Sequence, residues 1–224
     1  MVAKLDRLGS WRDGLRNARS MPVATSGGAA HRAAAPEYLI HVGMPQAGSS
    51  FLQDVLFPKC KDVHFISNRV PENVSAFYNP VCSQEDYFWS ETAAASWLRA
   101  ASNPNKLNVI SFERFSCTFV LSRHMVAQRL ARLCPRAKCL IVVRNQYDAI
   151  VSMYAQRARN PLIHLSPFEE FFFLNMRDPQ SSEFRRYFYD ELVSDYENLF
   201  GPESVFVLPY EMLRSDGGSF VRKI

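Results

Sequence analysis

Short runs of apolar residues alternate along the chain with longer stretches whose apolar positions recur at helical spacing. The short runs predict β-strands at residues 38–42, 63–66, 107–112, 139–143 and 204–208. The helical spacings predict helices at residues 51–56, 84–101, 120–133, 146–157, 168–175 and 182–200. Residues 68–79 are polar and carry Pro71, with Pro80 directly after them, and we expect a loop there.

This alternation of strands and helices is typical of an α/β fold with a central parallel sheet. It predicts a three-layer α/β/α domain, because each crossover helix must cover a face of the sheet. Ligands of such folds bind beyond the carboxyl ends of the strands. We therefore expect the functional residues just after the predicted strands, at 43–50, 111–116, 144–148 and 209–211.

Composition and charge fit a single globular domain with a basic extension. Of the 224 residues, 47% are hydrophobic and 21% charged, which suits one sizeable core. Residues 1–35 hold six basic and two acidic residues and so account for the net charge of +4. The neutral remainder argues against a nucleic-acid partner. We expect a flexible basic segment at residues 1–35, with a targeting peptide as the alternative, and one domain at 36–224.

The apolar runs are too short for a membrane anchor. None approaches the ~18 residues of a membrane span. Five cysteines without paired spacing predict reduced thiols. Together these features predict a cytoplasmic protein.

The first predicted strand runs into a glycine-rich loop with the pattern G-x-x-x-x-G-S-S, which is the Walker A spacing and predicts a P-loop NTPase-like fold. Backbone N–H groups of such a loop, and of the helix after it, point at one spot and carry partial positive charge. A phosphate is the natural occupant of that spot. Ser49 stands where a nucleoside triphosphatase has its lysine, which argues against an ordinary ATP or GTP hydrolase.

A second candidate anion site follows the predicted strand at 139–143. Arg144 comes directly after this strand, and Ser152 lies eight residues further on, in the next helix. A guanidinium forms short charge-assisted hydrogen bonds with a phosphate dianion, and a serine hydroxyl adds a neutral donor. The alternative is an arginine that merely precedes an amphipathic helix and pairs with Asp148.

The two motifs together resemble those of sulfotransferases that use 3'-phosphoadenosine 5'-phosphosulfate (PAPS) and release 3'-phosphoadenosine 5'-phosphate (PAP). The resemblance extends from about residue 38 to residue 213. It implies that the 3'-phosphate is held by Arg144 and Ser152, without a metal. It also implies that the 5'-phosphosulfate is held by the loop residues Pro45, Gln46, Ala47, Gly48, Ser49, Ser50 and Phe51.

The resemblance also implies a carboxylate or histidine base near the acceptor. Glu113, just past the strand at 107–112, is the first candidate, and its alternative role is an ion pair with Arg114. Glu72, in the loop after the second strand, is the second candidate. His41, His64 and His124 are expected to be structural.

Gln46 departs from the family pattern, which has lysine there to stabilise the leaving group. It is the third candidate catalytic residue. Arg114 or Lys106 is a possible substitute cation. Three functions stay open: a PAPS-dependent sulfotransferase acting on a carbohydrate or small-molecule hydroxyl or amine, a degenerate PAP- or PAPS-binding sensor or scaffold, and a P-loop kinase-like phosphotransferase.

Overall fold

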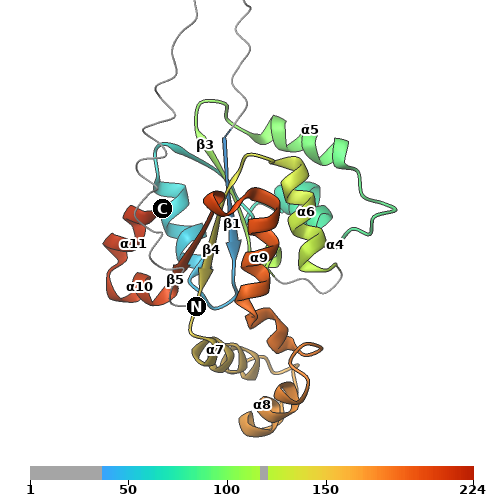
Figure 1. Ribbon diagram of the computed structural model, residues 1–224, viewed down its shortest axis with the longest axis vertical. Helices are drawn as coiled ribbons and strands as arrows, with labels where there is room; N and C mark the ends of the chain where they lie inside the picture. The colour runs from blue at the N-terminus through green and yellow to red at the C-terminus, as the bar shows by residue number, and fades with distance from the viewer. Residues whose placement is uncertain (1–36, 117–120) are drawn as a thin grey trace, which may run out of the picture.

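The computed structural model describes residues 37–116 and 121–224, which form a five-stranded parallel sheet with helices around it (Figure 1). The strands follow the order β2-β3-β1-β4-β5 across the sheet. Their bounds are β1 Glu37–Gly43, β2 Val63–Ile66, β3 Leu107–Phe112, β4 Lys138–Val143 and β5 Val205–Pro209. The predicted α/β fold is thus confirmed, and each predicted strand is present to within one residue at either end.

The first strand, β1, lies at the centre of the sheet. It pairs with β3 from Glu37 opposite Leu107 onwards, and with β4 on its other side. Ile40 and Val42 are fully buried, as expected of a parallel strand covered on both faces. Because β1 is central, the loop that follows it opens in the middle of the carboxyl edge, between chain segments that leave β3 and β4.

The helical segments connect the strands, and two of them follow the last strand. They are α2 Ser49–Phe51, η2 Leu52–Leu56, η3 Phe57–Lys59, α3 Pro71–Asn73, η4 Val74–Tyr78, α4 Asn79–Ser83, α5 Glu91–Ala101, η5 Glu113–Phe115, α6 Arg123–Leu133, α7 Gln146–Ala158, α8 Phe168–Arg177, η6 Glu183–Tyr187, α9 Tyr189–Phe200, η7 Pro202–Ser204, α10 Tyr210–Ser215 and α11 Gly217–Lys223.

The helices α6 and α9 pack together against one face of the sheet, in front of it in Figure 1. Tyr196 of α9 is fully buried there and donates a hydrogen bond to the Phe115 carbonyl at 3.2 Å. The helices α7 and α8 lie beyond the carboxyl ends of the strands instead. They therefore form one wall of the region in which a ligand of this fold would bind.

The expected loop at residues 68–79 was wrong, because this segment is largely helical. It contains α3 and η4, and α4 follows directly. Pro71 stands in the first turn of α3, where a missing N–H costs nothing, and Pro80 lies where the continuous helical run changes from η4 to α4. Phe77 and Tyr78 are fully buried and fix the segment on the core. Pro71 therefore marks the start of a helical run and not a loop.

Two predicted helices also have different limits. The helix expected at 84–101 begins only at Glu91, because the Ser90 side chain accepts a hydrogen bond from the Ala93 N–H at 3.2 Å and caps it. Its buried residues are Ala94 and Leu98. The helix expected at 182–200 is divided at Phe188 into η6 and α9, since Phe188 has non-helical backbone angles.

Across the described ranges, the helices are all too short or too polar to span a bilayer. The basic segment predicted at residues 1–35 lies outside the described residues, as does the predicted start of the helix at 120.

Candidate active site at the carboxyl edge of the sheet

A cavity of about 380 Å³ opens at the carboxyl edge of the sheet, where the loop after β1 faces α7. Its lining combines the glycine-rich loop with residues that directly follow β3 and β4 and with residues of α7 and α10. The lining residues are Pro45, Gln46, Gly48, Ser49, Ser50, Glu113, Arg144, Ser152, Gln156 and Tyr210. Most of the predicted site residues therefore surround one space.

The glycine-rich loop is a tight turn that ends in a helix. The Ala47 N–H donates to the Met44 carbonyl at 3.2 Å, and the Ser49 hydroxyl donates to the same carbonyl at 3.1 Å. Gly48 has a φ of 81°, a left-handed conformation that side chains disfavour. The helical run of α2, η2 and η3 starts immediately after it, and its first N–H groups lie at the loop.

Gly48 leads to a stability prediction. A Cβ atom there would lie 2.9 Å from the Tyr210 ring, in addition to the left-handed φ. Gly48→Ala is therefore expected to lower the free energy of unfolding by about 2 kcal/mol, measured by urea titration. Gly217→Ala is the matched control, because its Cβ would meet only Leu213, at 3.9 Å. Equal losses in the two variants would contradict this account of the loop.

Arg144 follows β4 and reaches back to the loop. Its Nη1 donates to the Gln46 carbonyl at 3.0 Å, and its guanidinium carbon lies 5.1 Å from the centre of the Tyr210 ring. The side chain that caps α7 is that of Asn145, which accepts from the Asp148 N–H at 3.2 Å. Arg144 is thus fixed against the glycine-rich loop and is not a helix-capping residue.

Ser152 lies on α7, opposite Gln46. Its hydroxyl donates to Gln46 Oε1 at 2.7 Å, and Gln46 Nε2 donates to Gln156 Oε1 at 2.5 Å. Gln46 itself has a φ of 67°, which is uncommon for a residue with a side chain. The side chain at the position of the family lysine therefore runs to α7. Gln156 was not among the predicted site residues, although its place one turn after Ser152 puts it on the same helix face.

Glu113 is the first residue after β3 and lines the cavity in a partly buried position. Burial raises the pKa of its carboxyl group above the ordinary glutamate value, and the Arg69 charge and a hydrogen bond with Ser49 offset part of that rise. Arg69 is held by Asp54, with its Nε 2.9 Å from Oδ1. A carboxylate destabilised in this way is a better proton acceptor than an exposed one.

Other predicted residues lie away from the cavity lining. Glu72 is exposed on the three-residue α3, and Ala47 and Phe51 pack in or against the core. Arg114, expected as a substitute cation, binds Asn79 Oδ1 at 3.2 Å and Ser83 Oγ at 2.5 Å. Its guanidinium therefore binds residues of α4 and not the glycine-rich loop.

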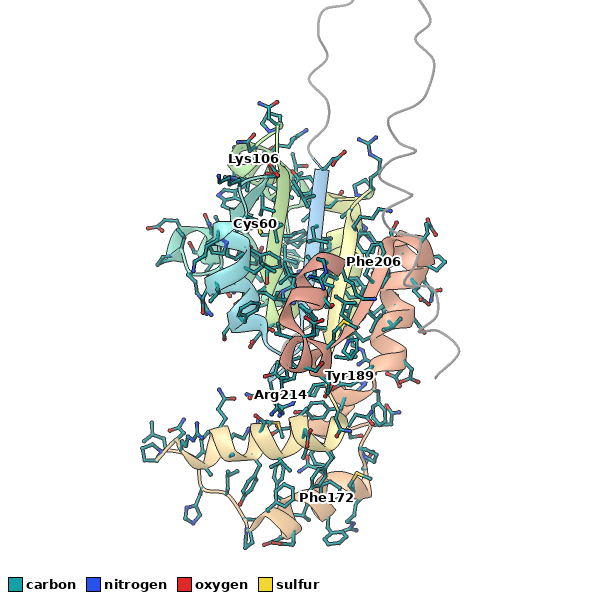
Figure 2. All side chains as sticks on the ribbon, turned by 90° about the vertical axis from the view of Figure 1, so that its left-hand side faces the viewer. Cys60, Lys106, Phe172, Tyr189, Phe206 and Arg214 are labelled. Atoms are coloured by element: carbon teal, nitrogen blue, oxygen red, sulfur yellow. The ribbon has the colours of Figure 1, made fainter. Side chains whose placement is uncertain are left out.

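Lys106, the other expected substitute cation, precedes β3 at its amino end. Figure 2 shows it at the opposite end of the sheet from Tyr189 and Arg214. Parallel strands place their amino ends at the edge away from the ligand site. Lys106 therefore cannot replace the family lysine. Among the described residues, Arg69 is the cation whose charge acts on Glu113.

The histidines expected to be structural lie outside the lining of this cavity. His41 is fully buried, its Nδ1 lies 2.6 Å from Ser111 Oγ, and burial lowers its pKa to about 3. His64 Nε2 lies 2.8 Å from the Ala101 carbonyl, and His124 Nδ1 lies 2.9 Å from Asp195 Oδ1. In residues 37–116 and 121–224, no three His, Cys, Asp or Glu side chains gather into a metal site.

A larger cavity of about 760 Å³ lies between η6 and the amino ends of α6 and α9. Its charged side chains largely pair with one another. Arg123 forms an ion pair with Glu191 and lies 3.7 Å from Asp195, and Arg186 lies 3.7 Å from Glu183. This cavity therefore presents balanced charge, whereas the smaller one presents a glycine-rich loop and an arginine.

The chain matches the family model of the sulfotransferase domain over residues 36–224, and it therefore belongs to the sulfotransferase family. A sulfotransferase from Alicyclobacillus acidocaldarius has a similar structure, with a TM-score of 0.60 at 24% identity over 84% of this chain and 78% of that one. Mouse sulfotransferase SULT7A1, solved with PAP, has a TM-score of 0.51 at 18% identity over 84% of this chain and 57% of that one. No match was found among curated proteins.

Proposed function

We propose that this protein transfers a sulfuryl group from PAPS to a hydroxyl or amine of a carbohydrate or small-molecule acceptor. One observation carries the proposal: the glycine-rich loop and the Arg144–Ser152 pair line the same cavity of about 380 Å³. PAPS carries anionic groups at both ends of an adenosine and so fits two anion sites. The mouse relative was solved with PAP, which supports the same nucleotide here.

In this proposal the loop N–H groups hold the 5'-phosphosulfate and Arg144 with Ser152 holds the 3'-phosphate. The acceptor oxygen or nitrogen attacks sulfur in line, and its proton passes to the Glu113 carboxylate. The bond between sulfur and the 5'-phosphate oxygen breaks, and PAP leaves with the electron pair. Positioning and charge stabilisation supply most of the acceleration in transfers of this kind.

A second candidate function is a nucleotide-binding sensor or scaffold that turns over slowly or not at all. It is favoured by Gln46, which brings no charge to the leaving group and whose amide bonds to Ser152 and Gln156 on α7. Loss of one stabilising contact typically lowers the rate on the order of 10²-fold. A kinase-like phosphotransferase is less well supported, because the loop has Ser49 in place of the phosphate-binding lysine.

The nucleotide site is tested by thermal shift. PAP at about one hundred times its Kd is expected to stabilise the protein by about 2.7 kcal/mol, which for a domain of this size raises Tm by roughly 5–10 °C. ATP with magnesium is expected to produce a much smaller shift, because it has no 3'-phosphate. An equal shift with both nucleotides, or a shift with ATP alone, would refute a PAPS site.

Transfer of radiolabelled sulfate from PAPS to a panel of sugars, alcohols and phenols separates the two candidate functions. The enzyme proposal expects labelled product with at least one acceptor class. If the protein binds PAP but neither transfers the sulfuryl group of PAPS nor slowly hydrolyses PAPS, the sensor function is favoured.

A further inference from the structure

The helix α7 presents two polar side chains to the cavity, Ser152 and Gln156, which are four residues apart and so lie one turn apart on the same face. Ser152 belongs to the family pair for the 3'-phosphate, whereas Gln156 lies outside both motifs. Its side chain is nevertheless part of the cavity wall and is exposed to the cavity.

The contacts of Gln156 tie it to the loop residue that departs from the family pattern. Gln156 Oε1 accepts from Gln46 Nε2 at 2.5 Å, and Gln46 Oε1 accepts from the Ser152 hydroxyl at 2.7 Å. The left-handed backbone of Gln46 costs on the order of 1–2 kcal/mol, and these two bonds help to hold it. Gln156 therefore fixes both the position and the orientation of the Gln46 amide.

The same arrangement leaves hydrogen-bond donors facing the cavity. Each side-chain amide carries two N–H donors. The Gln46 amide uses one of them for Gln156, and Gln156 Nε2 has no hydrogen-bond partner among the described residues. A phosphate dianion accepts several hydrogen bonds at once, and neutral amide donors supplement the charged fork of Arg144.

We propose that Gln156 is a further residue of the 3'-phosphate subsite: it orients the Gln46 amide and donates its own N–H groups to the phosphate, and so favours nucleotides that carry a 3'-phosphate. This inference rests on the proposed PAPS site. On binding, the phosphate takes the Ser152 hydroxyl from Gln46, while the hydrogen bond between the two glutamines keeps both amides at the subsite.

Calorimetric titration with PAP and with adenosine 5'-monophosphate (AMP), which lacks the 3'-phosphate, tests the inference. Gln156→Leu removes the amide at similar volume and is expected to weaken PAP binding about 5- to 10-fold, the effect of losing one or two neutral hydrogen bonds. AMP binding is expected to weaken much less, because AMP makes no contact at the 3'-phosphate subsite. Gln156→Glu keeps the acceptor for Gln46 but adds a charge that repels the phosphate, and it is expected to weaken PAP binding more. The KM for PAPS should rise in both variants.

Gln128→Leu is the matched control, because Gln128 lies on α6 outside the cavity lining. In a Gln46→Ala background, Gln156→Leu is expected to cost less than it does alone, since part of its role is to hold Gln46. Equal losses for PAP and AMP, or no loss for PAP, would overturn the role of Gln156. A wild-type protein that binds PAP no better than AMP would remove the proposed nucleotide site itself, and the inference with it.

Discussion

Replacing Arg144 with alanine is expected to weaken PAP binding on the order of 100-fold. The guanidinium already lies at the glycine-rich loop, where its Nη1 donates to the Gln46 carbonyl at 3.0 Å, and it stacks near the Tyr210 ring. Charge-assisted hydrogen bonds contribute about 1.5–3 kcal/mol each, so the loss of two of them at the lower end of this range accounts for the factor. Isothermal titration with PAP measures it directly.

Two controls separate loss of the phosphate contact from loss of structure. AMP binding should change little in Arg144→Ala, because AMP has nothing to place at the 3'-phosphate subsite. Arg144→Lys keeps the charge but loses the planar fork, and an intermediate affinity is expected. If the alanine variant bound PAP as tightly as the wild type, Arg144 would serve only to brace the loop.

The strands were predictable because burial on both faces leaves an unbroken apolar run. Residues 139–143 form such a run, and residues 107–112 are apolar except for Asn108 and Ser111. The structure has strands at both places. The segment at 68–79 was not predictable in the same way, because Pro71 and Pro80 permit either a loop or a helix start. Packing of Phe77 and Tyr78 into the core decides between them, and a local pattern does not contain that information.

The site was predictable only where its residues follow strands in a fixed pattern. Their places after predicted strands, together with the family resemblance, indicated Arg144, Ser152 and Glu113, and the parallel order of the strands brings all three to one cavity. Gln156 lies on a helix whose place at the cavity depends on tertiary packing, and its sequence signal is its position one turn after Ser152. Tyr210 falls within the predicted edge at 209–211, but its approach to Arg144 follows from tertiary packing. Arg69 was not predicted either, because its effect on the pKa of Glu113 depends on how the two residues approach each other in the folded chain.

Glu113→Gln is expected to lower kcat for sulfuryl transfer by about 10²- to 10⁴-fold, the usual contribution of a positioned general base. Glutamine keeps the size of the side chain but cannot accept the acceptor proton. PAP affinity should stay close to the wild-type value, since the phosphates are held by the loop and Arg144. Glu72→Gln is the matched control, because Glu72 is exposed and outside the cavity lining, and its kcat should be nearly unchanged. The reverse ranking of these two variants would move the base to Glu72.

The pH dependence gives an independent test of the same residue. Burial raises the pKa of Glu113, with Arg69 and Ser49 opposing the rise. Only the carboxylate accepts a proton, so kcat/KM should fall as the pH drops through this raised pKa, at a pH above the ordinary range of glutamate. Arg69→Gln removes the opposing charge and should move this acid limb to higher pH, and Glu113→Gln should abolish it. An acid limb that persists in Glu113→Gln would assign the titration to another group and exclude Glu113 as the base.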